Sequence, residues 1–563
     1  MSVVLSEHLP LLASAPNGIQ KLRGLILELA VRGKLVPQDP NDEPASKLLK
    51  RIEQERNRFE ATGRSKSVKR LAPVAISERW FVAPANWCWV RFAGYAIEVA
   101  TGPFGSALHK SDYVFNGIPL VNPSHMIGGR IVPDLNVAVS QQKAEDLAGY
   151  RLSRGDVVMA RRGEVGRTAL VTEKEDGWLC GTGSFVIRLA SEASRDFVVM
   201  LFRSLSVRKH LGDEAVGTTM VNLNHGIING MPIAVPPLAE QHRIVAKVDE
   251  LMALCDRLEA EQSDAESAHA RLVEALLGTL AQSTDAADLA SNWQRIAEHF
   301  DTLFTTEGSV DALKKSILQL AVMGKLVPQD PTEGTAGDLV ERINGVRETK
   351  AANGLTKKIK SLPLLHNDAR PTYAPAHWVW VRLGAIIDLI SGQHLTPDEY
   401  VDDLTATIPY LTGPAEFGPV FPMPTRSTNQ TRAVSVLGDI LLTVKGSGVG
   451  KINRVVQDRI AISRQLMAIR PVVVGSDFIE LVLRSAERHF QAQTVGIAIP
   501  GIGREDVQML SIGLPPLGEQ KRIVAKVDEL MVLCDRMKAD LREARCQQSR
   551  LAETLIETAL EAA

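Results

Sequence analysis

The stretch IAVPPLAEQHRIVAKVDELMALCDRLEAE, residues 233–261, decides the fold, because it returns almost unchanged as IGLPPLGEQKRIVAKVDELMVLCDRMKAD, residues 512–540. A second stretch, AVRGKLVPQDP at 30–40, reappears as AVMGKLVPQDP at 321–331. Copies of this length do not arise by chance, and an internal repeat must be recognised before a fold is assigned. A chain of 563 residues is also too long for one hydrophobic core. We therefore expect two long units of similar layout joined head to tail.

The repeated stretch predicts a long helix in each unit. Its two prolines end an extended segment and permit a helix to start. The apolar residues that follow are spaced alternately by four and three, which is the pattern of a coiled-coil seam. They are Ile244, Val248, Leu251, Cys255 and Leu258 in the first copy, and Ile523, Val527, Leu530, Cys534 and Met537 in the second. Shorter helical segments are expected near the start of each unit, over residues 18–35 and 310–326.

Between the helical regions lie two globular segments that share landmarks but little identity. They begin at PANWCWVRF and PAHWVWVRL, where the paired tryptophans indicate a half-buried strand. GIPLV at 117–121 then matches TIPYL at 407–411, and RGDVVMARRGEVGR at 154–167 matches GDILLTVKGSGVGK at 438–451. Short β-branched runs broken by Gly, Pro, Asn and Asp are typical of mixed sheet with irregular loops.

The expected fold class is α+β: two globular mixed α/β domains joined by two long antiparallel coiled-coil helices, with a pseudo-twofold internal repeat. The boundaries follow from the repeat. They are an N-terminal helical region at 1–83, a first globular domain at 84–237, a central long helix at 238–283, a linker with the repeated helical region at 284–374, a second globular domain at 375–516, and a C-terminal long helix at 517–563.

Composition excludes several classes of protein. Hydrophobic residues at 45% and charged residues at 23% are ordinary for a globular protein, and we expect a cytoplasmic one because neither a signal peptide nor a long apolar run is evident. The balance of 64 Lys+Arg against 66 Asp+Glu speaks against unspecific coating of nucleic acid, so any DNA contact must come from local patches. The five cysteines show no zinc-ligand spacing, and we expect neither a metal site nor disulfides.

A doubled frame with diverged middles suits DNA, which has a twofold axis of its own and is read by dimeric repressors as two half-sites. The segment PPLxEQxRIVxKVDEL, at 236–251 and again at 515–530, resembles the DNA specificity subunit of type I restriction-modification systems over nearly the whole chain. The resemblance implies a noncatalytic subunit whose two target recognition domains read a divided, asymmetric target in double-stranded DNA. It also implies that the helical regions hold two modification subunits, which methylate adenine N6, and that a translocating restriction subunit joins them. S-adenosylmethionine, ATP and magnesium are accordingly expected on partner subunits, and no cofactor is expected in this chain.

Two other functions stay open at this point: a self-sufficient DNA methyltransferase or nuclease, and a coiled-coil scaffold for protein interactions. An amino-methyltransferase needs an Asn/Asp-Pro-Pro-Tyr type motif to hold the flipped base, yet the Pro-Pro pairs of this chain lie in VPPL and LPPL. GSGVGKI at 446–452 resembles a phosphate-binding loop, but Lys445 stands where the first glycine belongs and Ile452 cannot bind magnesium. Both observations favour a reader over an enzyme.

Candidate DNA contacts are cationic, amide or hydroxyl side chains near glycine turns, because the backbone can approach DNA closely there. A hairpin with solvated charges, or polar groups needed by the fold itself, would account equally for these patterns. The candidates are Ser106, His109, Lys110, Arg161, Arg162, Arg167, Asn222 and Asn224 in the first domain, and Lys445, Ser447, Lys451, Arg464 and Gln465 in the second.

Candidate partner contacts are side chains that lie off the coiled-coil seam and are identical in both copies. Packing of the seam does not require their identity, whereas docking of the same protein on both helices would. Recent duplication would also preserve them, although the diverged middles speak against it. The candidates are Glu240, Gln241, Arg243, Lys247 and Glu250 in the first copy, and Glu519, Gln520, Arg522, Lys526 and Glu529 in the second.

Overall fold

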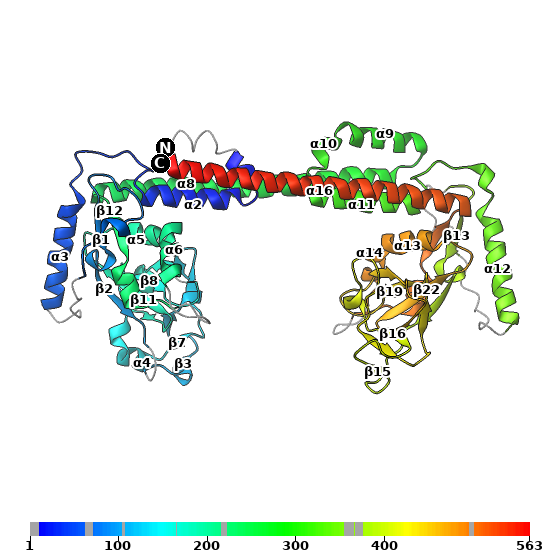
Figure 1. The fold of residues 1–563 in the computed structure, drawn as a ribbon, viewed down its shortest axis with the longest axis horizontal. Helices are drawn as coiled ribbons and strands as arrows, with labels where there is room; N and C mark the ends of the chain where they lie inside the picture. The colour runs from blue at the N-terminus through cyan, green and yellow to red at the C-terminus, as the bar shows by residue number, and fades with distance from the viewer. Residues whose placement is uncertain are drawn as a thin grey trace. The chain divides into compact units, whose positions relative to one another are not determined.

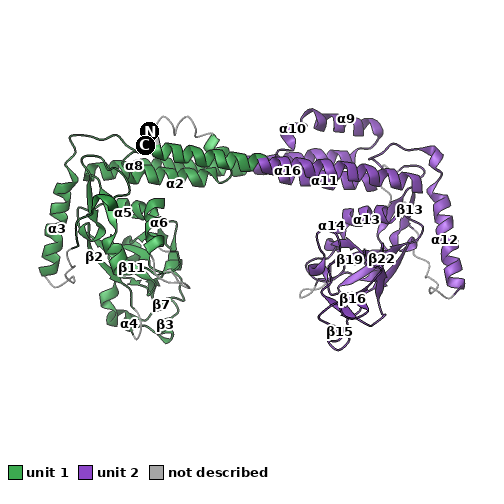
Figure 2. Ribbon diagram, in the orientation of Figure 1, with its two compact units in different colours: residues 1–264, 544–563 green, residues 265–543 purple. Residues whose placement is uncertain are grey.

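The computed structural model describes residues 11–61, 71–103, 107–164, 166–214, 222–353, 365, 375–494 and 500–562, and combines helices with sheets (Figure 1). It divides into two compact units, which Figure 2 colours separately. Unit 1 comprises Met1–Asp264 and Ala544–Ala563, and unit 2 comprises Ala265–Glu543. The mixed helix and sheet content of the predicted fold class is confirmed. No helix among the described residues has the length and apolar character needed to cross a membrane.

Two long helices each contribute to both units. Helix α8 (Leu238–Gln282) starts in unit 1 and ends in unit 2, whereas α16 (Leu517–Ala562) starts in unit 2 and ends in unit 1. The prolines that precede each helix follow short strands, β12 (Pro232–Val235) and β23 (Ser511–Leu514). Each unit therefore continues from its globular part directly into a long helix.

The seam residues of the long helices lie in the cores, as the sequence pattern predicts. In unit 1, α8 packs with α2 (Gly18–Val31) and with the end of α16. That core includes Leu22, Leu25, Ile26, Leu29, Ile244, Val248, Leu251, Cys255, Ala552 and Ala559. In unit 2, α16 packs with α11 (Glu307–Val322) and with the end of α8. That core includes Val273, Leu277, Leu280, Leu313, Ile317, Leu320, Ile523, Val527 and Cys534.

Both short helices end earlier than the expected 18–35 and 310–326, at Val31 and Val322. The cause is a glycine two positions later, Gly33 or Gly324, each at φ +72°, a left-handed conformation that ends a helix. A Cβ on Gly33 would lie 2.7 Å from Pro84 Cγ and 2.9 Å from Trp87 Cζ2, so the turn also packs tightly on the start of the globular part. Unit 2 repeats this contact with Pro375 and Trp378.

Gly33→Ala is expected to destabilise unit 1 by about 2–5 kcal/mol, from a left-handed alanine at about 1–2 kcal/mol and overpacking at about 1–3 kcal/mol. Gly128→Ala is the matched control, because Gly128 has φ +59° but no atom lies within 4 Å of the added methyl group. Denaturant midpoints followed by circular dichroism measure both effects. Equal shifts for the two variants would show that the Pro84 and Trp87 contact adds nothing.

The remaining helices flank this frame. Helix α3 (Ala45–Ala61) forms from the polar stretch after α2, and it buries Ala45, Leu48 and Ile52 alone, as a solvated helix would. Helix α12 (Ala336–Ala352) is its counterpart in unit 2 and starts with a capping box at Thr335. The others are α4 (Gln141–Asp146), α5 (Arg195–Arg203), α6 (Leu205–Glu214), α7 (His225–Gly230), α9 (Ala286–Glu298), α10 (Phe300–Leu303), α13 (Ser476–Ser485), α14 (Glu487–Ala492) and α15 (Arg504–Gln508).

The globular part of unit 1 holds three main sheets. Strands β1 and β12 pair antiparallel, β2-β11-β8-β9 form a four-stranded sheet, and β10-β4-β7-β3 form another in which β10 and β4 are parallel. A small hairpin joins β5 and β6. The strands are β1 (Cys88–Arg91), β2 (Ala96–Thr101), β3 (Tyr113–Val114), β4 (Ile118–Val121), β5 (Met126–Ile127), β6 (Arg130–Ile131), β7 (Ala138–Val139), β8 (Val157–Ala160), β9 (Thr168–Leu170), β10 (Leu179–Cys180) and β11 (Ser184–Leu189).

The globular part of unit 2 repeats the main features of this topology, with a further strand, β18, added to its second sheet. β13 pairs with β23, β14-β22-β19-β20 form the four-stranded sheet, and β15-β17-β16-β21-β18 form the second sheet, with β16 and β21 parallel. The strands are β13 (Val379–Arg382), β14 (Ile387–Ser391), β15 (Tyr400–Val401), β16 (Ile408–Leu411), β17 (Arg426–Thr428), β18 (Val434–Val436), β19 (Ile440–Thr443), β20 (Ile452–Arg454), β21 (Arg459–Ile462) and β22 (Leu466–Pro471). The two globular parts thus share one frame although their sequences differ.

Candidate nucleic-acid interface and helical partner face

Several loops of unit 1 meet beside the sheet β2-β11-β8-β9. The Arg161 amide donates to the Gly183 carbonyl at 2.9 Å, and the Leu223 amide donates to the Arg161 carbonyl at 2.9 Å. The Gly102 amide donates to the Ser184 carbonyl at 3.1 Å, which adds the loop after β2. We call these segments the unit 1 loop cluster: residues 102–103, 161–164, 181–183 and 222–224. Residues more than a hundred positions apart therefore form one surface.

Arg161 is held within this cluster. Its Nε donates to Asn222 Oδ1 at 3.2 Å, and its Cζ lies 5.4 Å from the centre of the buried Phe185 ring. Burial, followed by the nearby charge of Arg162, lowers the pKa of the Arg161 guanidinium, although an arginine remains charged. Arg162 is exposed, and its side chain has no hydrogen bond or ion pair within the described part of the chain. The hairpin between β8 and β9 thus presents one fixed and one free arginine.

Three other candidates of unit 1 also have partners within the fold. Arg167 pairs with Glu164 of the same loop and also donates to the Pro123 carbonyl at 3.4 Å. Asn224 caps α7, because its Oδ1 accepts from the Ile227 amide at 3.0 Å, and Asn222 accepts from Arg161. These contacts within the fold explain part of the sequence pattern that made Arg167, Asn222 and Asn224 candidates for DNA binding.

Two further candidates of the first domain, His109 and Lys110, lie outside the cluster. His109 and Lys110 are exposed at the 3-10 helix η4 (Lys110–Asp112), where the His109 amide donates to Asp112 Oδ2 at 2.7 Å. Neither has a recorded contact with the described residues of the unit 1 loop cluster. Ser106 lies outside the described residues. The structure therefore groups the candidates on the β8–β9 hairpin and before α7, but does not bring His109 and Lys110 to them.

Unit 2 builds the same cluster from different side chains. The Val444 amide donates to the Gln465 carbonyl at 2.8 Å, the Ile502 amide donates to the Val444 carbonyl at 2.9 Å, and the Gly392 amide donates to the Leu466 carbonyl at 3.0 Å. We call residues 392–393, 444–451, 463–465 and 500–503 the unit 2 loop cluster. All five candidates of the second domain lie in it and are exposed, namely Lys445, Ser447, Lys451, Arg464 and Gln465.

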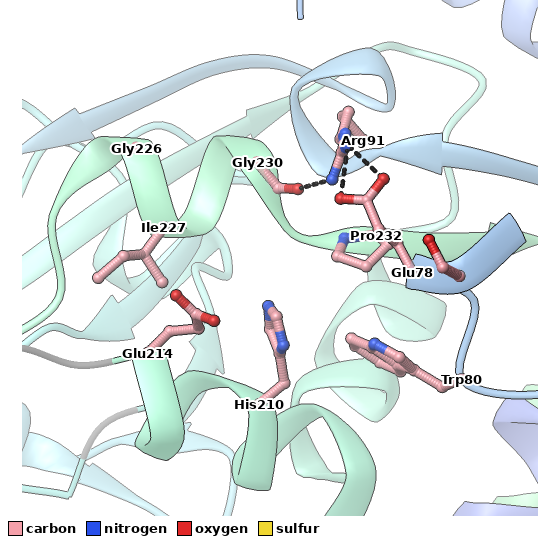
Figure 3. A pocket seen from close by; sticks show the side chains of 10 residues that line it. Glu78, Trp80, Arg91, His210, Glu214, Gly226, Ile227, Gly230 and Pro232 are labelled. Atoms are coloured by element: carbon pink, nitrogen blue, oxygen red, sulfur yellow. Dashed lines mark hydrogen bonds and ion pairs between the residues drawn. The ribbon is translucent and has the colours of Figure 1, made fainter. Parts of the chain in front are cut away.

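A pocket of about 420 Å³ in unit 1 is lined in part by α6 and α7 (Figure 3). Its one arginine, Arg91, is bound to the Glu78 carboxylate at 2.8 Å and to the Gly230 carbonyl at 3.0 Å. The His210 ring lies against Trp80 with centroids 5.1 Å apart and an angle of 43° between the ring planes, and burial lowers the pKa of its imidazole. Glu214 adds a further carboxylate. With its cation paired and acidic groups on its wall, this pocket does not suit phosphate.

No metal-binding chemistry is evident in the part of the chain that the structure describes. Among those residues, no three His, Cys, Asp or Glu side chains gather as metal ligands would. The five cysteines are free thiols, and burial raises the pKa of Cys180 to about 12.

The proposed partner residues nearest the start of each long helix are buried. Glu240 and Gln241 are 1% and 0% exposed, and Glu519 and Gln520 are 0% and 2% exposed. Glu240 accepts from Trp87 Nε1 at 2.9 Å, Glu519 accepts from Trp378 Nε1 at 3.0 Å, and Gln241 accepts from the Tyr95 hydroxyl at 2.8 Å. Burial raises the pKa of the Glu240 carboxyl. Packing does account for the identity of these four residues between copies, because they fasten each helix to its own globular part.

The other proposed partner residues, which lie further along each long helix, have different surroundings. Arg243 forms an ion pair with Asp42, and Arg522 forms one with Glu333, so both also bind neighbouring segments of their own units. Lys247 pairs with Glu250 at 2.7 Å and Lys526 with Glu529 at 2.9 Å, and these pairs lie at the surface. Leu533, one turn beyond Glu529, is 45% exposed. We define the partner face as Lys247, Glu250 and Leu254 on α8, and Lys526, Glu529 and Leu533 on α16.

Comparisons with known proteins lead to one protein family. Residues 105–266 match the family model described as the type I restriction modification DNA specificity domain. The specificity subunits of the type I restriction enzymes EcoAI and EcoEI, both from Escherichia coli, are 33% and 32% identical, each over 96% of this chain and 94% of the relative. A solved structure of the HsdS subunit from Thermoanaerobacter tengcongensis is 22% identical, covering 86% of this chain and 99% of that one, with a TM-score of 0.40.

Proposed function

The chain belongs to the family of type I restriction-modification DNA specificity subunits, and from that premise we propose that its two loop clusters read the two unlike halves of one DNA target. The observation that carries the proposal is the pair of loop clusters. They share their backbone hydrogen bonds, yet Arg161 and Arg162 of unit 1 stand where unit 2 has Val444 and Lys445. One frame with two sets of side chains suits two different half-sites.

Chemistry of the side chains supports DNA as the ligand. Phosphate contacts come from Lys and Arg, and base edges are read by Arg, Asn, Gln and hydroxyl groups in the grooves. Each loop cluster presents such groups at its surface, for example Arg162 in unit 1 and Arg464 in unit 2. A nearly balanced overall charge is compatible with this function, because a few cations placed on the loop clusters can supply the local contacts.

The long helices would set the spacing of the two half-sites by pairing antiparallel. Contacts within unit 2 support this orientation. Along α11 the ion pairs run from Glu307–Arg542 to Lys314–Asp535, so α11 and α16 have opposite directions. On either side of α11, His269 contacts the Thr302 carbonyl of α10 and Lys325 donates to the Ala281 carbonyl, so the chain runs along α8 in the same direction as α8 itself. These contacts support an antiparallel orientation of the ends of α8 and α16 within unit 2.

We further propose that each half of the partner face binds one modification subunit, and that a translocating restriction subunit joins this complex. Support comes from the identity of the partner-face residues in both copies and from the exposed apolar side chain of Leu533, which is 45% accessible. An apolar side chain with polar groups around it matches the apolar core and polar rim of protein interfaces. In this proposal the chain is noncatalytic, and S-adenosylmethionine, ATP and magnesium belong to its partners.

DNA contact through the unit 2 loop cluster predicts a change in salt dependence. Replacement of Lys445 and Lys451 by Ala removes two phosphate contacts, which should make the slope of log K against log salt shallower by about 1.8, at about 0.9 per contact. The measurement is binding of target duplex by the chain assembled with its modification subunit, at several salt concentrations. Lys315→Ala, an exposed lysine of α11, is the control and should leave the slope unchanged. An unchanged slope in the double variant would contradict phosphate contact at this loop.

The two other candidate functions have distinct outcomes. A self-sufficient methyltransferase would transfer labelled methyl groups from S-adenosylmethionine to DNA without partners, and we expect no transfer by the purified chain. A coiled-coil scaffold would assemble with its partners but bind no DNA. Absence of DNA binding by the assembled complex would sink the proposed function.

A further inference from the structure

Arg161 has the geometry of a preorganised reading group. Its backbone is fixed on both sides, by the carbonyl of Gly183 and the amide of Leu223. Its guanidinium lies over the Phe185 ring, and Phe185 is itself held in the core at 0% exposure. An arginine fixed before binding loses less conformational entropy on contact than a free surface arginine does. These restraints are not needed by a residue that only carries surface charge.

The anchor on Asn222 decides which part of the guanidinium remains available. Asn222 Oδ1 accepts from Nε, while Nη1 and Nη2 have no recorded partner within the described part of the chain. Two parallel donors on one edge match the O6 and N7 acceptors of guanine in the major groove, which is the commonest specific contact of arginine. Asn222 can leave that edge free because it binds the guanidinium at Nε.

Unit 2 lacks this arrangement at the equivalent place. Val444 replaces Arg161 and is 1% exposed, and Gly501, which bridges to Lys445 as Asn222 does to Arg162, has no side chain to act as an anchor. The exposed arginine of that cluster is instead Arg464, on the turn before β22. In unit 1 the same turn has Gly181, Thr182 and Gly183. The position of the forked donor therefore differs between the units, on a common backbone.

We propose that Arg161 is the residue of unit 1 that selects a guanine in the first half-site, and that Asn222 and Phe185 are positioning residues that hold its guanidinium for this contact. The inference rests on the proposed function and makes it more specific. Arg162, which is exposed and lacks an anchor, contributes phosphate binding without base selection. The arrangement in unit 1 assigns this guanine to the first half-site.

The test uses the chain assembled with its modification subunit and a set of duplexes in which each base pair of the methylation-mapped target is replaced in turn. The unmodified chain should discriminate against replacement of one G·C pair in the first half-site by roughly 10–100-fold. Arg161→Lys keeps the charge but removes the fork, and Asn222→Ala removes the anchor. Both should reduce discrimination at that pair to below about threefold, with discrimination in the second half-site unchanged.

Two variants separate positioning from a general structural role. Asn222→Asp retains an acceptor for Nε and should restore discrimination, even if its added charge lowers affinity for every duplex. Arg162→Ala should weaken binding to all duplexes alike and leave discrimination intact. Full discrimination by Arg161→Lys at every first half-site position would overturn the assignment of Arg161, and identical behaviour of Asn222→Ala and Asn222→Asp would overturn the role of Asn222. A wild-type complex without sequence discrimination in either half-site would instead refute the proposed function itself.

Discussion

Exchange of residues 84–235 for the corresponding segment of another specificity subunit is expected to change one half of the DNA target completely and to leave the other half unaltered. The unit 1 loop cluster lies wholly within this segment, and α8 begins after it, at Leu238. The unit 2 loop cluster is retained. The measurement is a map of methylated adenines in the DNA of cells that carry the original or the exchanged chain.

The contacts across the boundary dictate how the exchange must be made. Trp87 and Tyr95 lie in the exchanged segment, whereas their hydrogen-bond partners Glu240 and Gln241 lie on the retained helix. The donor must therefore keep Trp and Tyr at these positions, because an unpaired buried carboxylate or amide would cost about 1–3 kcal/mol or more. The reciprocal exchange of residues 375–514 is the control and should change the other half-site. A change in both half-sites after a single exchange would contradict independent reading.

Charge reversal on the partner face is expected to remove the modification subunits one at a time. Lys247→Glu should leave a complex with one modification subunit, Lys526→Glu should do the same, and the double variant should bind none. A like-charge contact across an interface costs several kcal/mol, and even about 2 kcal/mol corresponds to roughly 30-fold in affinity. Native mass spectrometry of the purified complexes measures the stoichiometry.

Local effects on the helices are too small to explain such a loss. Each substitution replaces an attractive pair three positions apart with a repulsive one, a change of about 0.5–1 kcal/mol in helix stability. Lys315→Glu on α11 is the control for an added negative charge at an exposed helical site. Retention of both modification subunits by the double variant would show that the partner face lies elsewhere on the chain.

The helical half of the fold could be predicted from the sequence because its contacts repeat at short, regular spacing. Ile244, Val248 and Cys255 form the expected apolar seam, and they are buried. The end of α2 was harder to place, because Gly33 stops the helix through its left-handed backbone, whereas the residues as far as Leu35 continue the apolar pattern.

Sequence identity between the two copies does not by itself show which residues contact a partner protein. It marks Lys247 and Glu250, which are at the surface, but equally Glu240 and Gln241, which are buried. The sequence does contain a sign that Glu240 is buried. Both Trp87 and Glu240 recur in the second copy, as Trp378 and Glu519, and in each copy the tryptophan donates to the carboxylate. Recurring donors and acceptors in the two copies therefore indicate a buried pair.

The loop clusters show what a single sequence cannot reveal. Arg161 and Asn222 were recognisable as separate candidates, since both lie near turns, but their contact joins residues 61 positions apart. Such contacts depend on how β8, β11 and α7 pack, and no periodicity in the sequence encodes that packing. The backbone hydrogen bonds match Arg161 with Val444, and they place Arg464 on a different turn of the cluster. The arginine therefore occupies non-equivalent positions in the two units.

The central claim is that two independent domains on one chain read two unlike half-sites. Mapping of N6-methyladenine in genomic DNA, with and without this chain, tests it most directly. The predicted result is a divided, asymmetric motif with one methylated adenine per strand, one in each half. An uninterrupted symmetric palindrome, or no chain-dependent methylation at all, would contradict it.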